Sequence, residues 1–362
     1  MGLCLENVSL ETAGQTIIDD VSLAFERGSL NVLLGPTLSG KTTLMRLMAG
    51  LDAPTRGRIL IDGKNVLGVP VRKRSVAMVY QQFVNYPTLS VYENIASPLR
   101  VAKVASSELD RRVREAARLL GLDPLLDRLP GQISGGQQQR TAIARAIVKG
   151  ADVVMLDEPL ANLDYKLREE LREELPRIFK ASGAILVYAT TEPLEALLLG
   201  GNTATLSKGR VAEFGPTPRV YHDTQVIESA RVFSDPPLNE VKAAKTGSSV
   251  TFGSLQPAAA AGVLKITPDG NYTIAFRADI VRLDAPWPES ISFPGRVAIA
   301  EISGSESFVH VETAIGTLVC VQPGVSEARA GEPVTLHVDA TRVFVFDPSG
   351  RRAAATQKNV SS

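Results

Sequence analysis

The chain has 362 residues, with 39 Lys and Arg against 39 Asp and Glu, so its formal net charge is zero. That balance leaves no basic footprint of the kind that binds nucleic acid, and the length suffices for two domains. The two cysteines, Cys4 and Cys320, stand far apart, which favours a reducing cytosol without disulfides. The sequence has no apolar run of membrane-span length and no signal-peptide pattern. We therefore expect any membrane association to come through a protein partner.

Residues 3–34 alternate apolar and polar side chains in short pieces, which predicts β-strands. A glycine-containing loop follows these predicted strands. The next stretch fits the pattern G-x-x-x-x-G-K-[S/T] and reads Gly35-Pro36-Thr37-Leu38-Ser39-Gly40-Lys41-Thr42-Thr43. In such a loop, backbone N–H groups turn toward phosphate oxygens, and the following helix points its positive end at them. The pattern predicts a phosphate site with Lys41 on the β- and γ-phosphates and the Thr42 hydroxyl on Mg²⁺; the alternative is a surface turn that merely contains glycine.

Polar residues close several of the predicted strands. Apolar segments predict strands at 57–63, 76–80, 152–158 and 184–188. The second is followed by Gln81, the third ends in Asp157-Glu158, and the fourth leads into Thr190-Thr191. Strands alternating with helices predict a largely parallel α/β core with ligands at the strand ends. Asp157-Glu158 could instead be a capping pair, and Gln81 alone is a weak signal because polar residues often end strands.

Three helices stand out between and after these strands. Apolar spacing predicts a helix over 107–120, and a charged segment predicts one over about 165–180 with a kink at Pro176. A third helix runs through Ile147 and opens with Ser134-Gly135-Gly136-Gln137. Ser134 is suited to cap that helix while the two glycines leave N–H groups open to an anion.

The sequence pattern changes near residue 234, from helices and strands to a loop-like segment and then to short strands. Residues 234–262 are predicted to be a linker or loose edge. Beyond them, short alternating segments predict a small all-β domain of barrel type, with strands near 272–277, 296–302, 307–313, 317–322 and 333–346. The tail at 353–362 is predicted to be disordered.

The glycine loop, the Ser134–Gln137 stretch and Asp157-Glu158, in this order, resemble the ATP-binding subunits of ABC transporters. The likeness is strongest to the ATPases of bacterial sugar and polyol importers, which carry a C-terminal β-domain. It implies an α/β P-loop NTPase domain over 1–233, with a helical subdomain at about 85–150, and then an OB-like β regulatory domain over 234–352. Finer likeness to an ATPase of bacterial glycerol importers lies in Val69-Pro70, Tyr86-Pro87, Tyr92-Glu93-Asn94-Ile95 and Thr190-Thr191-Glu192-Pro193.

The resemblance also implies roles for particular residues. Residues 35–43 would hold ATP. Mg²⁺ would be bound, directly or through water, by Thr42, Gln81 and Asp157. Glu158 would polarise the attacking water. Ser134, Gly135, Gly136 and Gln137, with the Leu163-Asp164 turn, would serve the ATP of a second ATPase subunit packed head to tail. Gln81 stands near four apolar residues that resemble a loop coupling nucleotide to a membrane permease, or that are ordinary core: Phe83, Tyr86, Leu89 and Tyr92.

The chain departs from the family pattern at its own nucleotide site. The usual histidine after the last core strand is Thr191, the usual adenine-stacking aromatic is Thr12, and a glycine common inside the loop is Leu38. A threonine hydroxyl cannot take on charge as an imidazole can. We therefore expect an asymmetric pair in which this chain has a weakened site and completes a competent site on a different ATPase. The rival hypothesis is a homodimer in which Glu158 still supports slow turnover.

The sequence is compatible with three functions to different degrees. The first is an importer motor at the cytoplasmic face of a bacterial inner membrane, working with permease subunits and indirectly with a solute-binding protein. The second is an ABC ATPase acting on nucleic acid or translation, which predicts duplicated cassettes, long coiled coils or a basic surface that the sequence lacks. The third is a regulatory or scaffolding protein in which ATP serves only as a switch.

Overall fold

The computed structural model describes residues 2–82, 84–161, 163, 165–283 and 286–354. The chain divides into two compact units, Met1–Pro218 and Arg219–Ser362. This division falls before the boundary expected at 233/234, because Ile227 and Ala230 of α8 (Ile227–Val232) pack against the β-sheet residues Ala275, Phe344 and Phe346. Among the described residues, no helix is both long enough and apolar enough to cross a bilayer.

The first unit is built on a six-stranded sheet in the order β10-β9-β3-β8-β7-β6. Its strands are β3 (Leu30–Leu34), β6 (Val76–Val79), β7 (Val153–Asp157), β8 (Ile185–Thr190), β9 (Asn202–Ser207) and β10 (Arg210–Pro216). All neighbouring pairs except β9–β10 are parallel, which confirms the predicted α/β core. The register pairs Leu34 with Thr190 and Asp157 with Ala189, so the carboxyl ends of β3, β7 and β8 lie at one edge.

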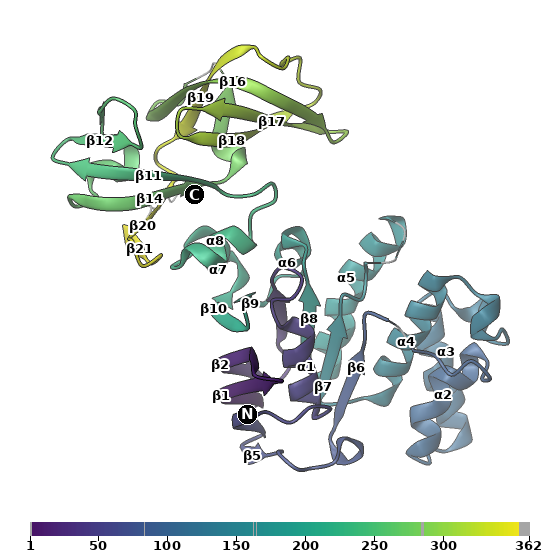
Figure 1. The fold of residues 1–362 in the computed structure, drawn as a ribbon. Coiled ribbons are helices and arrows are strands. Elements are labelled where there is room, and N and C mark those ends of the chain that lie inside the picture. Colours follow the sequence, from purple (N-terminus) through teal and green to yellow (C-terminus); the bar gives the residue numbers. More distant parts are fainter. Residues whose placement is uncertain (1, 83, 162, 164, 284–285, 355–362) are drawn as a thin grey trace. The chain divides into compact units, whose positions relative to one another are not determined.

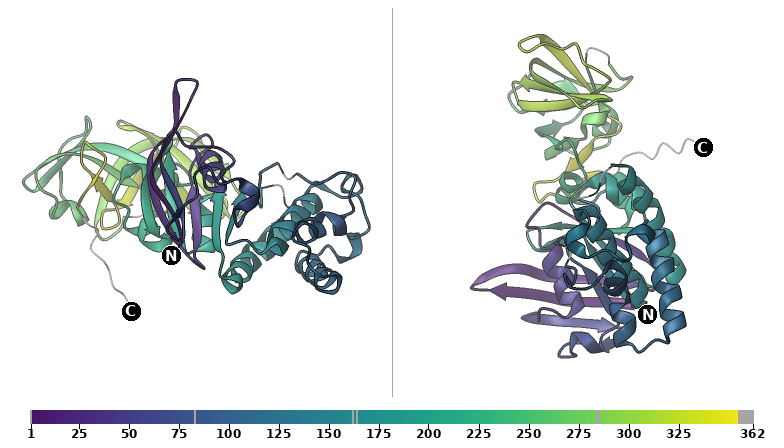
Figure 2. Two further views of the ribbon diagram at one scale, coloured as in Figure 1. Left: turned by 90° about the horizontal axis from the view of Figure 1, so that it is seen from below. Right: turned by 90° about the vertical axis from the view of Figure 1, so that its right-hand side faces the viewer.

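A second sheet, in the order β2-β1-β4-β5, covers one side of the first unit. It comprises β1 (Gly2–Thr12), β2 (Gln15–Glu26), β4 (Arg56–Ile61) and β5 (Lys64–Asn65). One apolar core joins residues of both sheets, such as Leu5 and Val187, to the inner face of α1 (Lys41–Ala49). The right-hand view of Figure 2 shows the purple strands of this sheet on one side of the unit and the teal helices on the other.

The helices of the first unit fall into two groups. α2 (Val91–Val101), α3 (Ser106–Leu119) and α4 (Gly135–Lys149) pack on one another beside the sheet (Figure 1). α5 (Tyr165–Ser182) continues past Pro176, and α6 (Pro193–Leu199) follows β8. Short 3₁₀ turns occur at Val71–Lys73, Asp123–Leu125 and Pro130–Gln132.

The second unit begins in α7 (Thr217–His222) and has two antiparallel sheets around one core. The first sheet contains β11 (Asn239–Thr246), β12 (Ser249–Phe252), β13 (Ala258–Ala259), β14 (Gly270–Phe276), β20 (Phe344–Phe346) and β21 (Arg352–Ala354). The second contains β15 (Val281–Leu283), β16 (Ser290–Ile302), β17 (Glu306–Thr313), β18 (Gly316–Pro323) and β19 (Pro333–Asp339). 3₁₀ turns lie at Gly262–Lys265 and Ala278–Ile280. The predicted small all-β domain is thereby confirmed.

Two expectations for this unit were wrong in part. Residues 234–262 are not only a linker, because β11 lies between β12 and β14 and buries Val241 and Ala243 on alternate positions. Alanine and lysine have low strand propensity, so the residue types of this segment did not predict a strand. Of the predicted disordered tail, 353 and 354 belong to β21, and 355–362 lie outside the described residues.

A buried asparagine joins the two sheets of the second unit. Asn239, at the start of β11, is 4% exposed. Its Nδ2 donates to the Val319 carbonyl of β18 (2.8 Å), and its Oδ1 accepts from the Val319 N–H (2.7 Å). The side chain thus satisfies both backbone polar groups of one buried residue, as a neighbouring strand would.

We predict that Asn239→Ala lowers the unfolding free energy of the second unit by about 2 kcal/mol, because a buried N–H and a buried C=O lose their partners. Urea unfolding followed by fluorescence of Trp287, the single tryptophan, measures this unit. Asn271→Ala, at an exposed position of β14, is the control. Equal unfolding midpoints for the two variants would contradict the assignment.

Candidate nucleotide site

The glycine loop lies between β3 and α1, and backbone hydrogen bonds join it to β8 and to the turn between β9 and β10. The Gly35 N–H donates to the Thr190 carbonyl (3.3 Å), and the Gly209 N–H donates to the Ser39 carbonyl (3.0 Å). A Cβ on Gly35 would lie 2.5 Å from the Leu206 carbonyl oxygen, and Gly40 caps α1 with φ +103°. Both positions therefore require glycine, one for space and one for its left-handed backbone.

Lys41 points back into this loop. The side chain is 5% exposed, and Nζ donates to the carbonyls of Gly35 (2.7 Å) and Pro36 (3.0 Å). Burial lowers the pKa of the ammonium, while the charges of Glu158 and Asp157 oppose that shift. The Ser39 hydroxyl is also buried and has no hydrogen-bond partner among the described residues. A buried cation beside an unpaired hydroxyl fits the oxygens of a phosphate.

Asp157 and Thr42 form a pair that suits Mg²⁺. Asp157 ends β7, is 2% exposed, and its Oδ2 accepts from Thr42 Oγ1 (2.7 Å). Burial raises the pKa of this carboxyl, and the Thr42 hydrogen bond and the Lys41 charge oppose the rise. Mg²⁺ is commonly held by one or two protein oxygens together with substrate phosphates and water. The hydroxyl and carboxylate oxygens beside the loop fit that coordination.

Glu158 and Gln81 meet from different strands. Gln81 follows β6, and its Nε2 donates to Glu158 Oε2 (2.7 Å). Glu158 has φ +46°, an uncommon backbone conformation for a residue with a side chain, and its N–H donates to the Ala189 carbonyl (3.0 Å). Burial raises the pKa of its carboxyl, Lys41 opposes the rise, and Asp157 and Glu192 add to it. A raised pKa strengthens a carboxylate as a base.

A buried network behind Thr191 was missed by sequence reasoning. Thr191 itself is exposed after β8. Next to it, Thr190 Oγ1 and Tyr188 OH both donate to Glu195 Oε2, at 2.7 and 3.0 Å, and the Glu192 N–H donates to Thr190 Oγ1 (3.0 Å). The spacing of Tyr188 and Thr190 could have indicated the network, because side chains two positions apart on a strand lie on the same face. Burial raises the pKa of Glu195.

The remaining predicted residues lie on other elements. Thr12 is exposed at the tip of the β1–β2 hairpin, and Leu38, on the loop itself, is 97% exposed with φ +66°. The Ser134–Gln137 stretch opens α4, separate from the loop that opens α1 (Figure 1). Ser134 Oγ accepts from the Gln137 N–H (3.3 Å), and Gln137 Oε1 accepts from the Ser134 N–H (2.9 Å), which confirms the predicted cap. Phe83 and Asp164 lie outside the described residues.

The structure therefore brings five of the predicted site residues together. Lys41, Thr42, Gln81, Asp157 and Glu158 are linked by contacts at the carboxyl edge of the parallel strands. This is the edge at which α/β sheets bind ligands.

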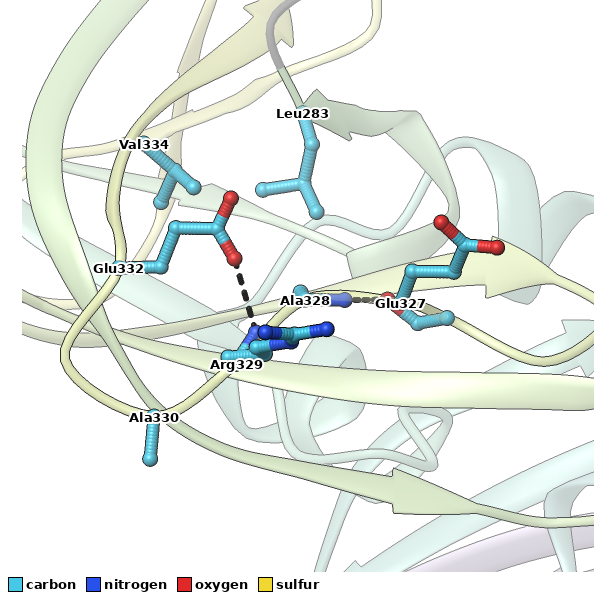
Figure 3. Close-up of a pocket in the computed structure, with 8 residues that line it drawn as sticks. Leu283, Glu327, Ala328, Arg329, Ala330, Glu332 and Val334 are labelled. Atoms are coloured by element: carbon cyan, nitrogen blue, oxygen red, sulfur yellow. Dashed lines mark hydrogen bonds between the residues drawn. The ribbon is translucent and has the colours of Figure 1, made fainter.

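The second unit has a hollow of its own (Figure 3). Leu283 and Val334 lie on one side, and the loop residues Glu327, Arg329 and Glu332 supply charged side chains. The Glu332 carboxylate accepts from the Arg329 N–H (2.9 Å), so it serves the loop's own fold. The hollow belongs to the second unit, whereas the groups gathered at the nucleotide site all belong to the first.

Comparison with known proteins agrees with both units. The family described as "ABC transporter" matches residues 18–161, and the family described as "TOBE domain" matches 274–346. The chain is 36% identical to the trehalose/maltose import ATP-binding protein MalK of Thermococcus litoralis, covering 93% of this chain and 95% of the relative. It is 34% identical to the sn-glycerol-3-phosphate import ATP-binding protein UgpC 3 of Agrobacterium fabrum, covering 92% and 94%.

A solved structure extends the comparison. The ATP-binding cassette MJ0796, in a dimeric post-hydrolysis state bound to ADP and Pi, has a TM-score of 0.55 and 28% identity to this chain. The alignment covers 59% of this chain and 98% of that one.

We predict that Glu195→Gln reduces the loss of stability with rising pH. Because its folded pKa is raised above the ordinary 4.5, Glu195 contributes stability below its unfolded pKa and loses it as pH rises through the folded pKa. Glutamine keeps an acceptor for Tyr188 and Thr190 but does not titrate. Denaturant unfolding at acidic and neutral pH should show the variant gaining on the wild type toward neutrality.

Glu173→Gln, at an exposed position of α5, controls for the loss of a carboxylate. A constant difference between wild type and Glu195→Gln across this pH range would refute the prediction.

Proposed function

The chain belongs to the ATP-binding proteins of the ABC transporter family, and from that premise we propose that it is the ATPase subunit of a solute importer. It binds ATP with Mg²⁺ at residues 35–43 and couples the nucleotide cycle to membrane permease subunits at the cytoplasmic face of a bacterial inner membrane. The observation that carries the proposal is the convergence of Lys41, Thr42–Asp157 and Gln81–Glu158 at one sheet edge.

The proposed solute is a small polyol or sugar, with glycerol first. Relatives named for trehalose/maltose and sn-glycerol-3-phosphate import support the class. The motif likeness at Val69-Pro70, Tyr86-Pro87 and Thr190 to Pro193 favours glycerol within it. A solute-binding protein and the permease select the solute, so this chain supplies the motor.

The chain's own residues account for phosphoryl transfer to water. Lys41 exchanges its two carbonyl acceptors for phosphate oxygens, and loop N–H groups add further donors. Thr42, Asp157 and Gln81 would hold Mg²⁺ directly or through water, and the ion would supply charge neutralisation. Glu158 orients the attacking water and accepts its proton. Thr191 offers a hydroxyl where relatives of this kind place an imidazole.

We further propose that the own site is weakened and that the partner is a different ATPase chain. Thr191 cannot carry charge, Thr12 offers no ring to adenine, and Leu38 holds a left-handed conformation that glycine adopts without strain. The Ser134–Gln137 cap, which would face the partner's ATP, is intact. Loss of one positioned transition-state group typically costs about a hundredfold or more in rate.

A cleft beside the helical subdomain supports the permease as partner. It lies between β6, α2 and α4 and is lined by Tyr86, Pro98 and Val101 together with cations such as Arg145. Val101 is 84% exposed and Tyr86 51%, and Arg145 lies over the Tyr86 ring at 5.2 Å. Tyr86 stands five residues after Gln81, so a partner seated there is near the loop that touches Glu158.

We predict that Lys41→Ala weakens binding of a fluorescent ATP analogue by about a hundredfold, because charge-assisted hydrogen bonds to phosphate are lost. Lys64→Ala, on the exposed strand β5, should bind like the wild type. Unchanged affinity in Lys41→Ala would refute the nucleotide site.

We predict that the purified chain hydrolyses ATP slowly and that Thr191→His raises turnover by about a hundredfold, since it restores a charged group at the phosphate. Glu158→Gln in the Thr191→His background should abolish the gain. Robust turnover by the wild-type chain alone, lost in Glu158→Gln, would favour the homodimer over the asymmetric pair.

We predict that Tyr86→Asp with Val101→Asp reduces the share of the chain found in the membrane fraction of producing cells, because charges would enter the apolar part of the cleft. Leu129→Asp, at an exposed leucine that does not line the cleft, is the control. ATP binding should be retained in both; membrane recovery equal to wild type would argue against this docking surface.

A further inference from the structure

The guanidinium of Arg277 is enclosed by aromatic rings in the second unit. Arg277 follows β14, and its Cζ lies 3.8 Å from the centre of the Tyr221 ring and 5.0 Å from that of Phe344. Tyr221 belongs to α7 and Phe344 to β20, so the side chain joins the helical segment to the sheet. Its NH2 donates to the Tyr221 carbonyl (2.8 Å), whereas Nε is buried and has no acceptor within the described part of the chain.

The charge of this guanidinium is not matched by a carboxylate of its own. Among the described residues, Asp279 is the acid that acts on Arg277, and Asp279 already accepts a hydrogen bond from Arg342 NH2 (3.0 Å). Burial lowers the pKa of Arg277, but a guanidinium keeps its proton in proteins. An enclosed cation that stays charged favours an anion from solution as its counter-ion.

His222 adds a basic group at the same place. Its ring lies 4.9 Å from the Tyr221 ring, which is also the ring that Arg277 covers. His222 is exposed and the Arg342 side chain is 50% exposed, so an ion can approach both from solvent. Partial burial, Arg277 and Arg342 each lower the pKa of His222. The two arginines therefore act on this imidazole, and the three side chains form one positive surface.

The balance of charge around this surface is positive. Arg352 of β21 reaches the Phe344 ring as well, at 4.7 Å, and is attracted by Asp223. Of the described groups that act on one another here, three guanidiniums stand against two carboxylates, Asp223 and Asp279. One positive charge is thus in excess while His222 is neutral.

We propose that His222, Arg277 and Arg342 form an anion site on the second unit that takes a tetrahedral oxyanion of the phosphate type. The three side chains come from α7, from the residue after β14 and from the turn after β19. A tetrahedral oxyanion offers oxygens to several separate donors, and guanidinium groups bind phosphate with charge-assisted hydrogen bonds. The site does not depend on the proposed nucleotide function, because every group named belongs to the second unit.

NMR of the full chain, with histidine labelled at its ring nitrogens and without nucleotide, tests the proposal. The sequence has three histidines, His222, His310 and His337, so each pKa can be followed separately. Inorganic phosphate should raise the pKa of His222 to or above the ordinary 6.5, because a nearby anion stabilises the imidazolium. Sodium chloride at the same ionic strength should raise it less, and the pKa values of His310 and His337 should not respond to phosphate.

Two variants of the site and one control complete the experiment. Arg342→Gln, at a half-exposed position, should increase the phosphate concentration needed for half of the effect by about tenfold, because a charged donor is lost. Arg277→Lys, which keeps a cation but not the planar fork, should weaken binding in the same direction. Arg282→Gln is the matched control, since Arg282 is an exposed guanidinium of the same unit that lies over the Trp287 ring at 3.4 Å.

Arg282→Gln should respond to phosphate as the wild type does. The proposal is overturned if phosphate leaves the pKa of His222 unchanged, or if sodium chloride at equal ionic strength raises it as much. It is also overturned if Arg342→Gln and Arg282→Gln need the same phosphate concentration.

Discussion

A carboxylate that is 2% exposed at the end of a parallel strand is the constraint around which the first unit is arranged. Asp157 is costly to bury as an anion, and the hydrogen bond from Thr42 and the charge of Lys41 offset that cost only in part. Under the proposed function, Mg²⁺ would supply the remaining positive charge beside this carboxylate.

Several polar groups of the site are paired with one another, although the buried Ser39 hydroxyl has no partner among the described residues. Lys41 donates to loop carbonyls, Thr42 to Asp157, and Gln81 to Glu158. Each of these bonds uses a group that the proposed function assigns to ATP, Mg²⁺ or the attacking water. Under that proposal, nucleotide entry would be an exchange of hydrogen-bond partners, with no need to expose an unpaired buried charge. The same exchange would release Gln81 from Glu158.

The departures from the family pattern all fall on residues that the resemblance assigns to the chain's own nucleotide site. Leu38 is almost fully exposed and holds a left-handed backbone, and Thr191 leaves a hydroxyl beside the site. The Ser134 cap and α4 show no such departure. This contrast is the basis of the proposed asymmetric pair.

Local features were readable from the sequence because they depend on neighbouring residues. The glycine loop between β3 and α1, the Ser134 cap and the parallel core all follow from spacing, backbone freedom and apolar runs. The strand β11 was not readable, because its alanines and lysines have little strand propensity until β12 and β14 pair with them.

The amino-acid order by itself determined the phosphate loop, the carboxylates that end β7 and the family to which they point. Only the tertiary structure decided which distant groups meet: Gln81 with Glu158 across 77 positions, Asn239 with Val319 across 80, and Arg168 with Glu192 across 24. Such pairs depend on strand register and on which helix face turns inward. Register and helix orientation are set by the burial of the whole core, so no local stretch of sequence encodes the pairs.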